Sequence, residues 1–183
     1  MQIAEKKKYT DEDYMMLEEG APFQLINYDL IVSPSPTTNH QGISLELILL
    51  LTAHLKNIND QGYWAYAPLD VRLDEGNVLQ PDIVYISAER KNELVKDRIE
   101  GAPDLIIEIL SPSNAIYDLR QKKDLYQKYG VKEYIIIDPV SKNADLYSIK
   151  NGEYYLHQRA EKSEVLNSVL LPGLSFPLSK IFK

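Results

Sequence analysis

Apolar residues recur at helical spacing between Gln41 and Ile58. They are Ile43, Leu47, Leu50, Leu51 and Ile58. This period predicts one long helix over Gln41–Ile58. The Pro, Ser and Thr residues of Ser33–Thr38 predict the loop before it, and Thr38 or Asn39 can cap the helix.

A shorter helix and a hairpin precede this segment. Thr10 followed by Asp13 is typical of a helix N-cap with an acidic first turn, and the helix is expected to end near Gly20. Phe23–Val32 alternates in the manner of a β-hairpin, with Asn27–Asp29 as its turn. The chain therefore begins with a small helix and hairpin.

After Tyr63 the apolar spacing changes to that of extended chain. The predicted extended segments are Tyr63–Leu73, Val78–Ile86, Asp104–Leu110 and Glu133–Asp138, followed by Ala144–Ile149, Glu153–Gln158 and Glu164–Leu170 as a terminal meander. Asp104–Leu110 is nearly all apolar, which is typical of a strand covered on both faces. Ser111–Asn114 is expected to cap a helix over Ala115–Tyr129, closed by Gly130. This alternation predicts one α/β domain over residues 1–183.

The composition of the chain excludes several classes of protein. The 183 residues are 44% hydrophobic and 26% charged, which is ordinary for a globular chain. No run of roughly 18 apolar residues exists, so no membrane span is expected. The absence of Cys excludes disulfides and thiolate catalysis and favours the cytoplasm. The net charge of −7 does not favour nucleic acid as a partner, although a local basic patch is enough for binding.

Two acidic residues stand in segments that otherwise predict buried strands. Asp82 follows Pro81 and begins an apolar run, and Glu108 interrupts Asp104–Leu110. Each acid alone is more often a strand-edge residue that reaches solvent, or half of a buried ion pair, because an isolated buried carboxylate is costly. Two such acids on neighbouring strands instead offer the oxygen ligands that Mg²⁺ prefers.

Other acidic residues and a cluster of basic residues could join Asp82 and Glu108 in a site. Helical spacing places Glu46 beside the apolar face of the long helix, where it is either a third acid of the site or an acid at the rim of the apolar stripe. Asp70 is interpreted as structural. Five basic residues follow Glu108 with one acid among them, and they are Arg120, Lys122, Lys123, Lys128 and Lys132. Such a run is usually a solvated helix face. Lys122 and Lys123 nevertheless both lie near the edge of the apolar arc, and either could polarise a water or a phosphate.

Several of these segments together resemble the Uma2 family. The resemblance rests on Pro81–Val84, on Gly101–Ser113, and on the spaced residues Asp118, Lys122, Tyr126, Gly130, Val131, Glu133, Tyr134 and Asp138. Ser33–Pro36, His40–Gln41 and Leu171–Leu174 extend the likeness over nearly the whole chain. The chain departs from the family pattern in lacking a Gly in the Asn27–Asp29 turn, and in having Ile135 where Trp is frequent.

The resemblance implies the PD-(D/E)xK nuclease superfamily and a restriction-endonuclease-like core. That core comprises a helix, a three-stranded meander, a second helix and a further strand. Residues 39–140 would form it, between an N-terminal helix and hairpin (1–38) and a C-terminal meander (141–183). Asp82 would be the motif aspartate, Glu108 the second acid, and Glu46 the acid of the first core helix. Leu110 occupies the position of the usual motif lysine, whose counterpart in similar proteins lies on the following helix, here at Lys122.

The implied activity is metal-dependent hydrolysis of phosphodiester bonds in nucleic acid, DNA foremost. Asp82, Glu108 and the carbonyl of Ile109 would hold Mg²⁺ or Mn²⁺, and Lys122 would orient the attacking water or stabilise developing charge. Duplex cleavage by one set of acids per chain predicts a homodimer. Its expected surfaces are the Phe23–Val32 hairpin and the C-terminal meander.

Two other functions compete with this one. The first is a non-catalytic nuclease-fold module that binds DNA or a protein partner. The presence of the full set Glu46, Asp82, Glu108 and Lys122 favours the enzyme. A small-molecule hydrolase finds no support, because the chain has no Gly-x-Ser-x-Gly motif and no Cys nucleophile. No P-loop motif is present either.

Overall fold

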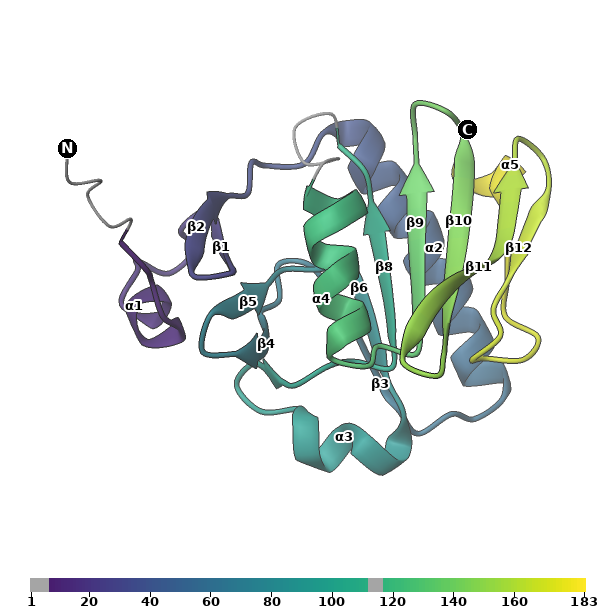
Figure 1. Ribbon diagram of the computed structural model, residues 1–183. Coiled ribbons are helices and arrows are strands. Elements are labelled where there is room, and N and C mark those ends of the chain that lie inside the picture. The colour runs from purple at the N-terminus through teal and green to yellow at the C-terminus, as the bar shows by residue number, and fades with distance from the viewer. Residues whose placement is uncertain (1–6, 112–116) are drawn as a thin grey trace.

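A six-stranded sheet forms the centre of the molecule, with helices on both faces (Figure 1). The computed structural model describes residues 7–111 and 117–183. The strands, in spatial order, are β11 (Glu153–Glu161), β10 (Asn143–Lys150), β9 (Glu133–Asp138), β8 (Leu105–Ile109), β6 (Ile83–Ile86) and β3 (Tyr63–Tyr66). Neighbours pair antiparallel except β8 and β9, which are parallel. The parallel pair is joined by the π-helical turn η1 (Tyr117–Lys122) and helix α4 (Lys123–Lys128).

A second, smaller sheet flanks the first. Its strands, in spatial order, are β2 (Asp29–Val32), β1 (Phe23–Ile26), β5 (Asn77–Leu79), β4 (Val71–Asp74) and β7 (Ile99–Glu100). The remaining elements are α1 (Asp11–Met15), α2 (Thr38–Asn57), α3 (Ala88–Leu94), β12 (Val165–Asn167), β13 (Ser175–Pro177) and α5 (Leu178–Ile181). The predicted mixed α/β architecture is confirmed. No described helix is both long and apolar enough to cross a bilayer.

The N-terminal elements largely follow the sequence pattern. The hairpin β1–β2 is confirmed, and Asn27 and Tyr28 at its turn have φ of 52° and 66°. This left-handed backbone is the one that a two-residue hairpin turn requires, so the turn forms without the Gly common in similar proteins. Helix α2 begins three residues earlier than predicted, because Thr37 caps it by accepting a hydrogen bond from the His40 N–H. Helix α1 ends at Met15 and not near Gly20.

The prediction of one strand over Val78–Ile86 is wrong, because this segment forms two strands, β5 and β6, that belong to different sheets. Pro81, which has no N–H, stands between them. The preceding Gln80 N–H donates to the Gln24 side chain of the small sheet at 2.8 Å. The predicted segment Tyr63–Leu73 divides in the same way into β3 and β4. The chain therefore crosses between the two sheets at both places.

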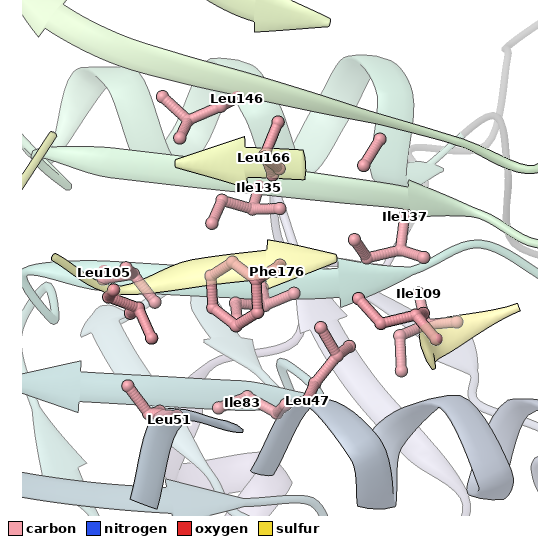
Figure 2. Close-up of a cluster of buried hydrophobic side chains, with 14 of the residues drawn as sticks. Leu47, Leu51, Ile83, Leu105, Ile109, Ile135, Ile137, Leu146, Leu166 and Phe176 are labelled. Carbon is pink, nitrogen blue, oxygen red and sulfur yellow. The ribbon is translucent and has the colours of Figure 1, made fainter. Parts of the chain in front are cut away.

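The hydrophobic core has one layer on each face of the central sheet. Figure 2 shows Leu47 and Leu51 of α2 facing Ile83, Ile135 and other aliphatic residues of the sheet. Leu166 of β12 and Phe176 of β13 lie over the same face and are fully buried. The opposite face packs against Leu125 and Tyr126 of α4. The last strands of the chain are thus part of the same core as helix α2.

Candidate active site

Asp82 and Glu108 lie opposite one another on neighbouring strands. In the antiparallel pair β6–β8, Ile83 is opposite Ile107 and Val84 is opposite Ile106. Continuing this register by one residue places Asp82 across from Glu108. Directly opposite residues of an antiparallel pair project from the same face of the sheet. The sequence prediction that these two acids share a site therefore agrees with the strand register.

The Asp82 carboxylate is held at one of its oxygens. Asp82 Oδ2 accepts a hydrogen bond from the Ile109 N–H at 2.8 Å, and His40 Nε2 of α2 lies 3.3 Å from the same oxygen. The described chain offers no hydrogen bond or ion pair to Oδ1. The Asp82 side chain retains 16% of its exposure. One oxygen is thus oriented by the protein while the carboxylate stays accessible.

Glu108 is buried and paired with a cation. It is 2% exposed, and its Oε1 accepts hydrogen bonds from Lys122 Nζ at 2.9 Å and from the Tyr126 hydroxyl at 2.7 Å. Lys122 is 3% exposed and Tyr126 is fully buried. Both donors lie on the connection from β8 to β9, four residues apart and therefore on one helix face. Their charge and hydrogen bonds offset the cost of burying the carboxylate.

The neighbouring Lys123 points elsewhere. Its Nζ lies 3.6 Å from the centroid of the Tyr147 ring, and burial lowers the pKa of the Lys123 ammonium. This is a cation–π contact on the sheet and not a contact with the acids. The structure thus brings Lys122, and not Lys123, to Glu108. The Ser111–Asn114 cap and the predicted helix start at Ala115 fall on residues 112–116, outside the described part of the chain.

The structure does not join Glu46 to this pair of acids. Its side chain is 24% exposed and forms an ion pair with Lys183 at the end of the chain. Asp70 accepts hydrogen bonds from the hydroxyl of Tyr14 and from the side chain of Gln80, at 3.0 Å each, which agrees with a structural role. Of the four predicted site side chains, only Asp82, Glu108 and Lys122 are brought together, and the Ile109 backbone lies beside them.

Sequence reasoning did not assign His40 and Tyr126 to the site. His40 lies in the first turn of α2, six residues before Glu46, directly after the loop of Pro and Ser residues. The helical period places Tyr126 on the apolar arc of its helix, which predicts a packing role. Tyr126 lies four residues after Lys122, and this helical spacing is the one sequence signal that could have predicted that both side chains bond to Glu108.

Two other buried acids have structural partners. Glu133 accepts hydrogen bonds from Ser168 Oγ and from the N–H groups of Val169 and Leu170, at 2.7 to 2.9 Å, and so holds the C-terminal loop against the sheet. Asp104 Oδ1 accepts from Lys132 Nζ at 2.8 Å and from Arg90 at 2.9 Å. Lys132 pairs with Asp104 and Lys122 pairs with Glu108. Fewer of the basic residues between Arg120 and Lys132 are therefore available to bind a ligand than the sequence indicates.

Asp104 is expected to stabilise the fold at neutral pH and to lose that effect in acid. Burial opposes its charge, yet hydrogen bonds from Lys132, the Ser87 N–H and Arg90 hold the pKa of Asp104 below its ordinary 3.8. Because the pKa of Asp104 is lower in the folded than in the unfolded protein, its carboxylate contributes fully to the free energy of unfolding above about pH 4. This contribution declines as the pH falls through the lowered pKa. Asp104→Asn should therefore lower the free energy of unfolding by about 2–3 kcal/mol at pH 7.

Urea unfolding of the Asp104→Asn variant and the wild type at pH 7 and at pH 3 measures this contribution. The difference between the two proteins should shrink at pH 3. A difference of the same size at both values would contradict the charge-based account. Lys150→Gln, on an exposed side chain at the end of β10, is a control for the loss of one charge.

Within residues 7–111 and 117–183, no three His, Asp or Glu side chains converge as a metal-binding group. The candidate ligands are instead two carboxylates and a backbone carbonyl. That set fits Mg²⁺, which keeps several waters and takes few protein ligands. The accessible Asp82 carboxylate, oriented at only one oxygen, fits the same requirement.

Comparison with known proteins places this chain in a family. The model of the Uma2 family, described as "Putative restriction endonuclease", matches residues 11–179. Two uncharacterized proteins of Synechocystis sp. are similar in sequence. The protein sll1609 is 29% identical over 144 residues, covering 75% of this chain and 79% of that protein. The protein slr1290 is 25% identical over 182 residues, covering 96% of this chain and 92% of that protein.

A solved structure shares the fold. The crystal structure of a "putative nuclease belonging to DUF820" from Anabaena variabilis superposes with a TM-score of 0.79, at 20% identity, over 94% of this chain and 97% of that one. The family model covers nearly all of the described elements, from α1 into α5. The resemblance inferred from the motifs is therefore confirmed, and the chain belongs to the Uma2 family of restriction-endonuclease-like proteins.

Proposed function

We propose that this protein is a metal-dependent nuclease of the PD-(D/E)xK type that hydrolyses phosphodiester bonds in DNA. The observation that carries the proposal is the convergence of Asp82, Glu108 and Lys122 at one end of β6 and β8. The order helix α2, antiparallel strands β3–β6–β8, helix η1–α4 and parallel strand β9 supports a restriction-endonuclease-like core.

Asp82, Glu108 and the Ile109 carbonyl are the groups that would hold the metal. Bound there, Mg²⁺ or Mn²⁺ would supply a water of lowered pKa and neutralise charge on the phosphate. The Ile109 N–H and His40 keep Asp82 in one orientation, and Tyr126 does the same for Glu108. A site whose ligands are already oriented loses less entropy when it binds its substrate.

Lys122 is the candidate electrostatic catalyst. Hydrolysis adds water across a phosphorus–oxygen bond, and negative charge builds on the phosphate oxygens before the bond breaks. An ammonium 2.9 Å from the Glu108 carboxylate lies within reach of a water or phosphate oxygen that contacts the same carboxylate. Because the ammonium is buried, water screens its field weakly, which strengthens its effect on developing charge.

One observation supports the alternative of a non-catalytic module. Lys122 and Tyr126 already satisfy the Glu108 carboxylate without any metal, as in a structural ion pair. Such a module would bind DNA or a protein and retain the pair for stability alone. The two functions differ in whether cleavage occurs and whether it depends on a divalent cation.

A cleavage assay separates these functions. Supercoiled, linear and single-stranded DNA, and RNA, are incubated with the purified protein in Mg²⁺, in Mn²⁺ and in EDTA. We expect cleavage of DNA with either metal and none in EDTA. Asp82→Asn should reduce the rate by at least about 10²-fold, because it removes a charged ligand. The exposed Glu153→Gln, far along the sheet on β11, is the control and should cleave normally.

Calorimetric titration with Mn²⁺ gives a second readout that needs no substrate. Binding should be lost in both Asp82→Ala and Glu108→Ala. Metal binding that persists in both variants, or DNA cleavage that survives in EDTA, would contradict the proposal. Absence of cleavage together with intact DNA binding would instead support the non-catalytic module.

A further inference from the structure

The central sheet ends at β3, whose outer side is open in the described chain. The Ala67 N–H donates to the Asp82 carbonyl at 2.9 Å, and Ala65 is opposite Val84. Hydrogen-bonded pairs alternate along an antiparallel ladder, so Tyr63, Ala65 and Ala67 exchange bonds with β6. The N–H and C=O groups of Trp64 and Tyr66 therefore face outward. Within the described residues no group bonds to them.

An apolar face of helix α2 borders this open strand. Thr52 Oγ1 of α2 accepts a hydrogen bond from Trp64 Nε1 at 3.0 Å. Leu45 and Leu49 lie seven and three residues before Thr52, and so on the same side of the helix. They are 56% and 55% exposed, and Tyr66 is 60% exposed. Open backbone groups and exposed apolar side chains thus occur on one edge of the molecule.

Two other edge strands, β11 and β2, carry features that discourage pairing with another strand. Edge strand β11 contains Glu153, Arg159 and Glu161, and its pairing with β10 is interrupted by a register shift. Edge strand β2 begins with the charged Asp29. Charges and irregularities of this kind protect edges from pairing. Strand β3, with the sequence Tyr-Trp-Ala-Tyr, has neither a charge nor a bulge.

We propose that β3 pairs antiparallel with β3 of a second copy of this chain, about a two-fold axis that passes between the two Ala65 residues. This register makes Trp64 opposite Tyr66 of the partner subunit, so that the outward backbone groups of both strands bond to one another. Trp64 lies on the α2 side of the sheet, and Tyr66, two residues on, lies on the same side. Each such pair would therefore join two aromatic rings next to Leu45 and Leu49.

Self-complementarity is the reason for choosing a second copy as the occupant, because the outward backbone groups of Trp64 and Tyr66 can pair with the same groups of another β3. Two chains of net charge −7 repel each other, and they approach most readily through a surface that carries no charge. Strand β3 meets that condition and is self-complementary in the register described. The proposed surface differs from the expected hairpin and C-terminal meander. In that hairpin, β1 already pairs with β5 and its Leu25 is fully buried.

A single engineered cysteine tests the register. In the proposed pairing Ala65 is opposite Ala65 of the partner subunit as a non-hydrogen-bonded pair, with Cα atoms about 4.5 Å apart. This separation suits a disulfide. The chain has no native Cys, so the thiol of Ala65→Cys is unique. Mild oxidation should cross-link this variant at least tenfold faster than Val140→Cys, whose site in a turn is 80% exposed.

Sedimentation at micromolar protein tests the surface. The wild type should be a dimer, and Tyr66→Lys should be a monomer with unchanged circular dichroism, because the substitution places a charge at the edge. Tyr155→Lys, on the exposed opposite edge strand, is the matched control and should remain a dimer. A monomeric wild type, or equal cross-linking of Ala65→Cys and Val140→Cys, would overturn the proposal. Both readouts omit nucleic acid and are independent of nuclease activity.

Discussion

Replacing Lys122 by Met is expected to abolish DNA cleavage and also to lower the free energy of unfolding by about 3–5 kcal/mol. The cleavage loss follows from removing the only cation bonded to Glu108 in the described chain, and should be about 10²–10³-fold. The stability loss follows from burial. Lys122 and Glu108 are 3% and 2% exposed, so Met leaves the buried carboxylate without the cation that offsets its charge.

Lys123→Met is the matched control for this prediction. Lys123 contacts the Tyr147 ring, and its loss should cost about 0.5–1 kcal/mol and leave cleavage within a few-fold of wild type. The contrast between the two adjacent lysines is measured by cleavage rates in Mg²⁺ together with urea unfolding. If Lys123→Met loses cleavage and Lys122→Met retains it, the assignment of the catalytic lysine is off by one residue.

A double variant separates the catalytic and structural roles of this pair. Lys122→Met with Glu108→Gln removes both charges, and should recover most of the stability while cleavage stays absent. Mn²⁺ should also raise the melting temperature of Lys122→Met more than that of the wild type, because the cation would then compensate Glu108. A Lys122→Met protein that is destabilised but cleaves DNA at the normal rate would show that the pair is structural.

Phe176→Ala is expected to lower the free energy of unfolding by about 3–5 kcal/mol. Phe176 is fully buried in the same cluster as Leu47 of α2 and Ile135 of β9. Loss of the ring would leave a cavity against the central sheet. For a chain of this length, the change corresponds to a fall in melting temperature of about 10 °C. Thermal unfolding followed by circular dichroism measures it.

The shape of the Phe176→Ala transition tests whether residues 141–183 fold separately. Because the cluster joins α2, the sheet and β13, the variant should still unfold in one step. An early transition confined to the C-terminal strands would contradict a shared core. Val169→Ala, at a side chain that is 44% exposed, is the control and should change stability by less than about 0.5 kcal/mol.

Local sequence patterns and motifs were sufficient to predict several elements of this protein, its fold class and its family. Helix α2 and the β1–β2 hairpin follow from periods and turn residues within a few positions of one another. The mixed α/β class and the Uma2 family follow from the order of elements and the motifs around Asp82 and Glu108. Each of these features depends on neighbours in the sequence, which is why the sequence is sufficient for them.

Tertiary structure decided the features that depend on distant partners. Val78–Ile86 reads as one apolar strand, but its halves bond to different sheets, and strand pairing is non-local. The helical period placed both Lys122 and Lys123 at the edge of an apolar arc, and only contact with Glu108 distinguishes them. His40 reaches Asp82 across 42 positions of sequence. The sequence by itself determined which elements and acids are present, whereas packing determined which side chains meet, because hydrogen bonds and ion pairs require proximity in space.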